Sequence, residues 1–389
     1  MSQLTLTDAR VLTPDGIREG DVRIADGHVV AVDGVPAVPE TDSPVEDAPA
    51  EDSISLGGAL VVPGYVDLHV HGGGGHDMAG SAESMARAVR FHRGHGTTTT
   101  LASLVTAPVD DLVRQLSWAA DLADAGEIAG AHLEGPFLSH ARCGAQNPDY
   151  LLDPDLSAFG RMLDAARGWL RVITIAPELP GALDLVDAAV AAGVVAAVGH
   201  TDATYDETAA AYDHGARLAT HLFNGMRPIH HREPGPVLAS LDARVPCETI
   251  NDGIHLHPAV LREVLARGSD KLVLITDAID AAGVGDGVYT LGGQQVWVRD
   301  GAARLESGSL AGSSLTMDSA FARAVRDGVP LEAASAAASA NPARVLGLDD
   351  RGELRPGARA DLVVLDDAHD VMRVMRAGQW VTGDNDRHE

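Results

Sequence analysis

The sequence predicts an α/β protein, a (β/α)8 TIM-type barrel with a small β-sandwich domain formed by the N- and C-terminal segments. Three observations lead to this prediction: apolar β-type runs recur through the middle of the chain, Ala-rich amphipathic segments separate most of them, and both ends are strand-like and turn-rich. We expect residues 1–58 and 350–389 to form the small domain and residues 59–349 to form the barrel.

Eight β-type runs supply the expected barrel strands. They cover residues 60–70, 97–105, 128–135, 171–179, 195–201, 217–224, 245–252 and 271–278, and the clearest helical segments cover 81–96, 109–126, 183–193, 204–216 and 257–268. A doubly wound open sheet is the alternative, but no G-x-G-x-x-G motif follows the first run. Residues 287–312 are expected to form a hairpin inserted after the eighth strand.

Composition and charge exclude several classes of function. Lys and Arg total 29 against 56 Asp and Glu, and this net charge of −27 argues against nucleic acid or an anionic membrane as a partner. No apolar run reaches membrane-spanning length, and the N-terminus lacks the pattern of a signal peptide. The two cysteines, Cys143 and Cys247, give no disulfide framework, so we expect a cytoplasmic protein. Residues 35–53, rich in proline and acid, are expected to be a solvated loop.

Polar side chains stand at the ends of five expected strands. Side chains two apart on a strand share a face, so the two histidines of "HVH" point into one space. The set consists of His69 and His71 on the first strand, Glu134 on the third, His200 on the fifth, His221 on the sixth and Asp277 on the eighth. Each residue alone is more often structural. Because barrel chemistry occurs at the C-terminal ends of strands, the whole set predicts one metal site.

Glu134, His200 and His221 have the composition of a catalytic metal site, with two imidazoles, one carboxylate and room for water. Nitrogen and carboxylate ligands without thiolate suit zinc best, and also iron, manganese or cobalt. A bound ion lowers the pKa of water toward about 7. Asp277 then fits as the general base that takes the water proton and returns it to a leaving group. Asp277 can also be a further metal ligand, and the two roles are compatible.

We expect one or two ions, and a bridging ligand, if present, must be identified among the residues of the chain. Some barrel hydrolases bridge two metals with a carbamylated lysine, but the single lysine of this chain, Lys271, starts the eighth strand at the wrong end of the barrel. A bridging ligand must therefore be Glu134, with His69 and His71 holding the second ion.

Seven motifs together carry a family resemblance. They are "VPGYVDLHVHGGGG", "HLEGPFL", "GHTDA", "THLFNGMRPIHHREPG", "NDGIHLHP", "LITDAID" and "LAGSSLTMD", and they span most of the chain. With them the chain resembles the amidohydrolase superfamily and, within it, the N-acetylglucosamine-6-phosphate deacetylase family. The resemblance implies metal-dependent hydrolysis of N-acetyl-D-glucosamine 6-phosphate to D-glucosamine 6-phosphate and acetate, in amino-sugar catabolism and cell-wall recycling, by a homodimer.

The resemblance also implies roles for individual residues. Glu134, His200 and His221 become the primary metal ligands, and Asp277 becomes the catalytic proton acceptor and donor. Arg232 binds the 6-phosphate and can be supplied by the partner subunit; an arginine fork suits a phosphate dianion, and "HHREPG" is the densest cluster of potential positive charge. The other residues expected to contact substrate are Ala145, Gln146, Asn224, Gly225, His255, Leu310, Ala311 and Gly312.

Two departures from the family pattern bear on the chemistry. Gly225 stands where the family often has alanine, and Gln146 stands where some members place a histidine next to the substrate. Gln146 leaves open which group polarises the carbonyl of the substrate. A second metal on His69 and His71 can take over this role. Cys143 lies in the same loop as Gln146 and is interpreted as an incidental small residue.

Two other functions compete with this interpretation. Another amidohydrolase activity, such as that of a dihydroorotase-like cyclic amidase or a nucleobase deaminase, depends on a bridging lysine or on other ligand sets, and a suitable lysine is lacking here. A non-catalytic scaffold on the same barrel is expected to have lost metal ligands, and none is missing from this sequence.

Overall fold

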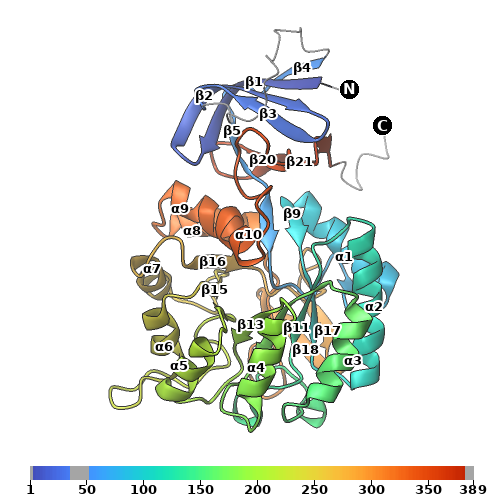
Figure 1. Cartoon of the computed structure of the whole chain (residues 1–389). Coiled ribbons are helices and arrows are strands. Elements are labelled where there is room, and N and C mark those ends of the chain that lie inside the picture. The colour runs from blue at the N-terminus through green and yellow to red at the C-terminus, as the bar shows by residue number, and fades with distance from the viewer. Residues whose placement is uncertain (1–2, 36–51, 382–389) are drawn as a thin grey trace. The chain divides into compact units, whose positions relative to one another are not determined.

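The computed structural model describes residues 3–35 and 52–381, which group into two compact units (Figure 1). The larger unit contains Asp67–His92 and Thr99–Thr316, and the smaller contains the described residues within Met1–Val66, Arg93–Thr98 and Met317–Glu389. Residues 36–51, which make up most of the expected solvated loop, lie outside the described residues.

A curled sheet of parallel strands forms the centre of the larger unit. Within the described residues it has seven strands in chain order: β10 (Ala102–Val105), β11 (Ala131–Glu134), β12 (Leu170–Ile175), β13 (Val195–Val198), β14 (Leu218–Ala219), β15 (Cys247–Ile250) and β16 (Leu272–Ile275). Nearly all of their residues are buried, as expected for parallel strands that are covered on both faces. The α/β class and the parallel order predicted from the sequence are confirmed.

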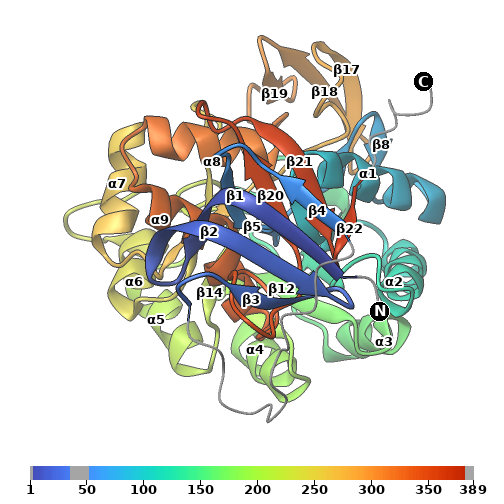
Figure 2. The ribbon, with the colours of Figure 1, turned by 90° about the horizontal axis from the view of Figure 1, so that it is seen from above.

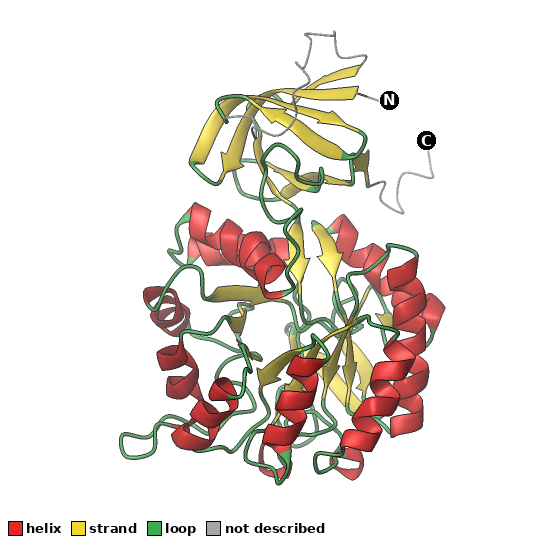
Figure 3. Cartoon of the chain, in the orientation of Figure 1, coloured by secondary structure: helices red, strands yellow, loops and turns green. Residues whose placement is uncertain are grey.

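Each connection between successive strands of this sheet contains a helix, on the outside of the strands (Figure 3). The helices are α2 (Val109–Asp124), α3 (Leu156–Ala166), α4 (Ala182–Ala191), α5 (Tyr205–Asp213), α6 (Gly235–Ala243) and α7 (Pro258–Ala266), and α1 (Ala82–Gly94) precedes the sheet. Leu112, Leu116 and Ala119 of α2 recur at helical spacing and are fully buried in the core. The five expected helical segments are confirmed as helices, and α3 and α6 were not among the segments named from the sequence.

The first expected strand is divided in the structure. β5 (Leu60–Pro63) belongs to the sheet of the smaller unit. β6 (Tyr65–Asp67) instead pairs with β9 (Thr97–Thr100). The prediction of one continuous strand is wrong, because β5 ends at Pro63 and Gly64 separates it from β6, which pairs in another sheet. The glycines that follow form two short strands, β7 (Gly72–Gly73) and β8 (His76–Asp77).

The segment after β6 hydrogen-bonds with residues at both edges of the parallel sheet. The Ser103 N–H donates to the Val70 carbonyl at 3.0 Å, and the Asp277 N–H donates to the His69 carbonyl at 2.8 Å. Residues 68–71 therefore connect the first strand of the sheet with the residues that follow its last strand.

The segment after β16 forms a small antiparallel sheet of its own. Its strands are β17 (Gly287–Leu291), β18 (Gln294–Arg299) and β19 (Ala302–Arg304). Gly292 and Gly293 have φ of 56° and 78°, the conformation that a two-residue hairpin turn requires. The hairpin expected within residues 287–312 is confirmed, and β19 extends it by one strand.

Strands from both ends of the chain meet in the smaller unit, where Figure 2 shows β1, β2, β5 and β20 side by side. The described strands are β1 (Gln3–Thr13), β2 (Gly16–Ala25), β3 (His28–Val32), β4 (Asp52–Ser55), β5, β20 (Leu362–Leu365), β21 (Val371–Arg376) and β22 (Gln379–Trp380). This unit also contains α8 (Met317–Arg326), α9 (Leu331–Ser335), a π-helical turn (Ala336–Ala340) and α10 (Asn341–Val345). The predicted domain boundaries at residues 58 and 350 stay a prediction.

None of the helices in the described part of the chain combines the length and the apolar character needed to cross a membrane.

Candidate metal centre

Four imidazoles and two carboxylates converge beyond the carboxyl ends of the strands in the larger unit. Glu134 is the last residue of β11, and the others follow β6, β13, β14 and β16. Every one of them is less than 10% exposed as a residue; the set is His69, His71, Glu134, His200, His221 and Asp277. The structure therefore brings together all six residues that the sequence pattern singled out.

Glu134 is shared by two potential ligand groups, His69–His71–Glu134 and Glu134–His200–His221. Its Oε1 lies 2.9 Å from Nε2 of both His200 and His221. Its Oε2 lies 3.2 Å from Nε2 of His71. A carboxylate in this position can bridge two cations, one in each group.

The geometry of the imidazoles fits bound cations. In each pair the Nε2 atoms face one another, at 3.0 Å between His69 and His71 and at 3.1 Å between His200 and His221. Every Nδ1 meets an acceptor, and when it donates its proton there, Nε2 carries a lone pair. Two facing lone pairs at this distance repel unless a cation lies between them. The four acceptors are Glu248 Oε2, Ser103 O, Arg142 O and Asn224 O.

The electrostatics of the centre also require positive charge. Burial lowers the pKa of the His69 imidazole, but Glu134 and Asp277 oppose it and hold the pKa well above its usual value. The same carboxylates raise the pKa of His71 to about 9 against the effect of burial. Burial would raise the pKa of the Asp277 carboxyl, yet His69 and His71 hold it below its ordinary value. Either protons or a metal ion must neutralise these carboxylates.

Several residues of the centre have left-handed backbone conformations. The φ angles are 47° for His200, 24° for His221, 79° for Phe223 and 50° for Asp277. Such conformations cost roughly 1–3 kcal/mol each in non-glycine residues and are concentrated at functional sites. Here they aim side chains from the turns after the strands toward one point.

A cavity of about 320 Å³ opens onto the centre, within the range of small-molecule sites. Its lining includes His71, Glu134, His200, His221 and Asp277. Seven of the residues expected to contact substrate also line it: Ala145, Gln146, Asn224, Gly225, His255, Leu310 and Gly312.

Two of the expected substrate residues do not line this cavity. Ala311 is fully buried and packs with Val296 and Ile279 in a small core next to the three-stranded sheet. Arg232 is exposed, and its guanidinium lies 2.8 Å from Nε2 of the neighbouring His231. Arg232 is therefore not among the residues that line the cavity.

Gln146 is fully engaged in holding Glu134. Its Nε2 donates to Glu134 Oε2 at 2.6 Å, and its Oε1 accepts the backbone N–H of Thr106 at 2.8 Å. Gln146 is one of the two departures named from the sequence, and its amide here orients the Glu134 carboxylate.

Gly225 meets a steric requirement. Its φ is +61°, and a Cβ at this position would lie 2.9 Å from Nδ1 of His200. Alanine would therefore need His200 or the turn to shift. His255, on the same cavity, is oriented by Asp252, whose Oδ2 lies 2.7 Å from its Nδ1.

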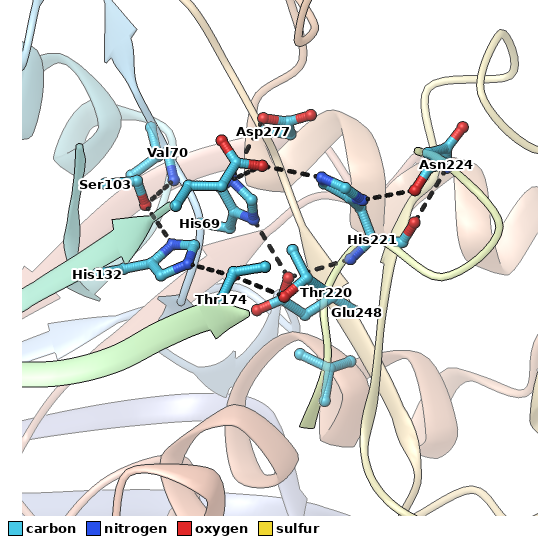
Figure 4. A network of polar contacts seen from close by, with 12 residues as sticks. His69, Val70, Ser103, His132, Thr174, Thr220, His221, Asn224, Glu248 and Asp277 are labelled. Atoms are coloured by element: carbon cyan, nitrogen blue, oxygen red, sulfur yellow. Dashed lines mark hydrogen bonds and ion pairs between the residues drawn. The ribbon is translucent and has the colours of Figure 1, made fainter. Parts of the chain in front are cut away.

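Sequence reasoning missed two residues that touch the ligands (Figure 4). Glu248 on β15 is fully buried and contacts His69. His132 on β11 lies with its ring 4.5 Å from that of His69, and it bonds with Ser103 Oγ at 3.1 Å and Thr174 Oγ1 at 2.9 Å. A lone charge inside "VPCETI" was the available signal for Glu248; His132 had only its position two residues before Glu134.

Comparison with known proteins assigns the family. Residues 60–381 match the model described as the amidohydrolase family. The chain belongs to the amidohydrolase family. This makes it a metal-dependent hydrolase, and the two groups that could hold a metal ion are consistent with that class.

Relatives of this amidohydrolase match it over nearly their whole length. A solved structure of N-acetyl-D-glucosamine-6-phosphate deacetylase from Mycobacterium smegmatis, an aspartate-to-alanine variant in complex with N-acetyl-D-glucosamine-6-phosphate, is 48% identical, with a TM-score of 0.91 over 98% of this chain and 100% of that one. N-acetylglucosamine-6-phosphate deacetylase of Bacillus subtilis (strain 168) is 36% identical over 93% of each chain. N-acetylgalactosamine-6-phosphate deacetylase of Escherichia coli O157:H7 is 36% identical over 95% of this chain and 97% of that protein.

Proposed function

We propose that this amidohydrolase deacetylates N-acetyl-D-glucosamine 6-phosphate to D-glucosamine 6-phosphate and acetate, in amino-sugar catabolism and cell-wall recycling. The observation that carries the proposal is the pair of ligand groups sharing Glu134, which face a cavity beside Asp277. The names of relatives with 36% and 48% identity support the choice of substrate. The galactosamine-specific name of one relative makes the 4-epimer the second candidate substrate.

The metal is proposed to be one or two divalent ions per subunit. Glu134, His200 and His221 would hold the first, and His69 and His71 with Glu134 would hold the second. Imidazole and carboxylate ligands suit Zn²⁺ best and also accept Fe²⁺, Mn²⁺ or Co²⁺. When bound, such an ion acidifies water to a pKa of about 7 and polarises a carbonyl oxygen.

Asp277 is proposed to carry the proton through the reaction. Hydrolysis adds water to the acetyl carbon, and the resulting tetrahedral species must lose an amine, which leaves only after its nitrogen is protonated. The Asp277 carboxylate would take the water proton and deliver it to that nitrogen. Its ionised form, favoured by His69 and His71, suits the first of these steps. Its Oδ1 lies 3.2 Å from His71 Nε2, which supports an action beside the ligand groups.

Substrate binding is assigned to residues around the cavity. Asn224, Gly225 and His255 would hold the sugar, and the segments containing Ala145, Gln146, Leu310 and Gly312 would enclose it. Arg232 would bind the 6-phosphate of a substrate in the partner subunit of a homodimer. Its exposed position outside the cavity of its own subunit supports this arrangement.

The proposal also covers the architecture of the chain and its location in the cell. We expect residues 68–71 to serve as the first strand of a closed (β/α)8 barrel spanning 59–349, with a β-sandwich made from 1–58 and 350–389. The hydrogen bonds of His69 and Val70 to both ends of the parallel sheet support closure. A cytoplasmic location remains our expectation.

Acetate release from a panel of N-acetylated amino sugars tests the function. The panel contains the gluco and galacto epimers, each with and without a 6-phosphate. The highest kcat/KM is expected for N-acetyl-D-glucosamine 6-phosphate, with loss of turnover after chelation and recovery on adding Zn²⁺, Fe²⁺, Mn²⁺ or Co²⁺. Full turnover by rigorously metal-free protein, or equal rates on phosphorylated and unphosphorylated sugars, would contradict the proposal.

A further inference from the structure

Glu248 is a buried carboxylate that the proposed chemistry leaves unused. It lies on β15, is 0% exposed, and its Oε1 has no hydrogen-bond partner among the residues that the structure describes. Its Oε2 lies 3.2 Å from Nδ1 of His69 and 3.2 Å from the backbone N of His221. Burying a carboxylate with so few partners is costly, so its presence here calls for a functional reason.

The contacts of this carboxylate reach both ligand groups. His69 belongs to the group that includes His71, and His221 belongs to the group that includes His200. Figure 4 shows Glu248 between His69 and the backbone of His221. Its backbone carbonyl also accepts the N–H of Leu222 at 2.8 Å. Glu248 thus holds the turn after β14, which carries His221, and it also holds the imidazole of His69 in the other ligand group.

His69 differs from the other three imidazoles in its Nδ1 partner. His71, His200 and His221 meet backbone carbonyls, whereas His69 meets a carboxylate. A carboxylate accepts the Nδ1 proton more strongly than a carbonyl, fixes the tautomer, and makes Nε2 a more basic ligand. His221 also has φ of 24°, and its N–H, donated to the same oxygen, helps to hold that unfavourable backbone.

We propose that Glu248 is a positioning residue that couples the two ligand groups and sets the affinity of the second ion through His69. This inference rests on the proposed metal-dependent function of the site. Glu248 does not contact the cavity. Its effect therefore passes through the ring of His69 and the backbone of His221.

The test replaces the carboxylate with a neutral group of the same shape, Glu248→Gln. Metal-free protein is titrated with Zn²⁺, and the dissociation constant of each ion is measured together with the bound metal content. An outer partner of a metal ligand changes affinity about 10- to 100-fold, and we expect a loss of that size for the second ion and a smaller loss for the first. Glu178→Gln is the matched control, because the Glu178 carboxylate bonds to Thr201 and Asp202 and to no ligand.

A second measurement separates positioning from general stability. In the zinc-loaded protein, the ring N–H proton of His69, assigned by its absence in His69→Asn, should resonate further downfield than those bonded to carbonyls. This difference should vanish in Glu248→Gln and persist in Glu178→Gln. If Glu248→Gln fails to fold, Glu248→Asp replaces it. Its side chain is one methylene shorter, so its carboxylate lies further from His69 and the affinity for the second ion should also fall.

The outcomes distinguish this inference from the proposed function. Wild-type affinity for both ions with an unchanged His69 resonance would overturn the role of Glu248 while leaving the metal site intact. Equal losses in the Glu248 and Glu178 variants would also overturn it, because they would indicate general destabilisation. Absence of metal binding by the wild-type protein would overturn the proposed function itself.

Discussion

The two ligand groups that share Glu134 are built in different ways. His200 and His221 sit in turns after β13 and β14 with left-handed backbone, at φ of 47° and 24°. His69 and His71 follow β6 on a segment whose backbone bonds to Ser103 of β10 and to residues just after β16. The Nδ1 atoms of the first pair meet backbone carbonyls, whereas in the second pair Nδ1 of His69 meets the Glu248 carboxylate.

This difference teaches how each group depends on the rest of the fold. The first group needs particular turn conformations, which Gly225 makes sterically accessible next to His200. The second group needs the backbone hydrogen bonds that join residues 69–71 to Ser103 and to the residues after β16, because a one-residue slip along them would turn the two imidazoles away. The second group also adjoins Asp277, at 3.2 Å from His71 and 3.6 Å from His69. Substitutions should therefore separate the two groups by metal content as well as by rate.

The largest effect is expected from Glu134→Gln, which removes the ligand common to both groups. The loss of a bridging negative charge should empty both groups, and kcat/KM should fall by at least about 10³-fold, the upper range for removing one electrostatic stabiliser. Metal analysis and acetate release are the measurements. A variant that keeps two ions would show that Glu134 does not bridge, and each group would then have to bind its ion without it.

Asp277→Asn should leave both groups occupied but stop proton transfer. The amide keeps the shape of the side chain and cannot shuttle a proton, so kcat should fall by at least about 10²-fold, the lower end for general acid–base catalysis, with KM little changed. Rate and metal content are measured on the same preparation. Near wild-type kcat with metal bound would move the proton role to another group, with His255 as the next candidate.

The sequence predicted the members of the centre better than their surroundings. Strand-end residues such as Glu134 and His221 were found because parallel strands bring their carboxyl ends together. Glu248 was missed because it lies within a strand, where its direction depends on a register that one sequence does not reveal. The apolar run 60–70 was interpreted as one continuous strand, but the structure divides it after Pro63 between two sheets. The side chain of Gln146 reaches Glu134 because of the path of its loop, and no periodic pattern in the sequence predicts that path.

His71→Asn should break the second group alone. Where the wild-type protein binds two ions, the variant should bind one, held by His200 and His221, and kcat should fall about 10²-fold, as for loss of one polarising group. His200→Asn is the comparison, and it should lose the first ion and more activity. Equal metal content and equal rates in the two variants would remove the distinction between the groups.

Arg232→Ala tests a residue outside both groups, so metal content should be unchanged. A charge-assisted contact to phosphate is worth roughly 1.5–3 kcal/mol, which corresponds to a loss of about ten- to a hundredfold in kcat/KM for the 6-phosphate sugar. The unphosphorylated sugar should be barely affected. Mixing Arg232→Ala with Asp277→Asn subunits should restore partial activity if the arginine acts across a dimer. The same loss on both sugars would assign Arg232 a structural role.

The smallest effect is expected from Gln146→Leu. The amide donates to Glu134 Oε2, the oxygen 3.2 Å from His71, whereas Oε1 faces His200 and His221. Losing this donor should lower the affinity for the second ion about tenfold, the lower end for an outer partner of a ligand. The affinity for the first ion should stay nearly unchanged. Gln294→Leu is the matched control, because Gln294 donates to the Ala145 carbonyl of the same loop and not to Glu134. Zinc titration of both variants measures the effect; a weaker first ion in Gln146→Leu would show that the two oxygens of Glu134 do not serve separate groups.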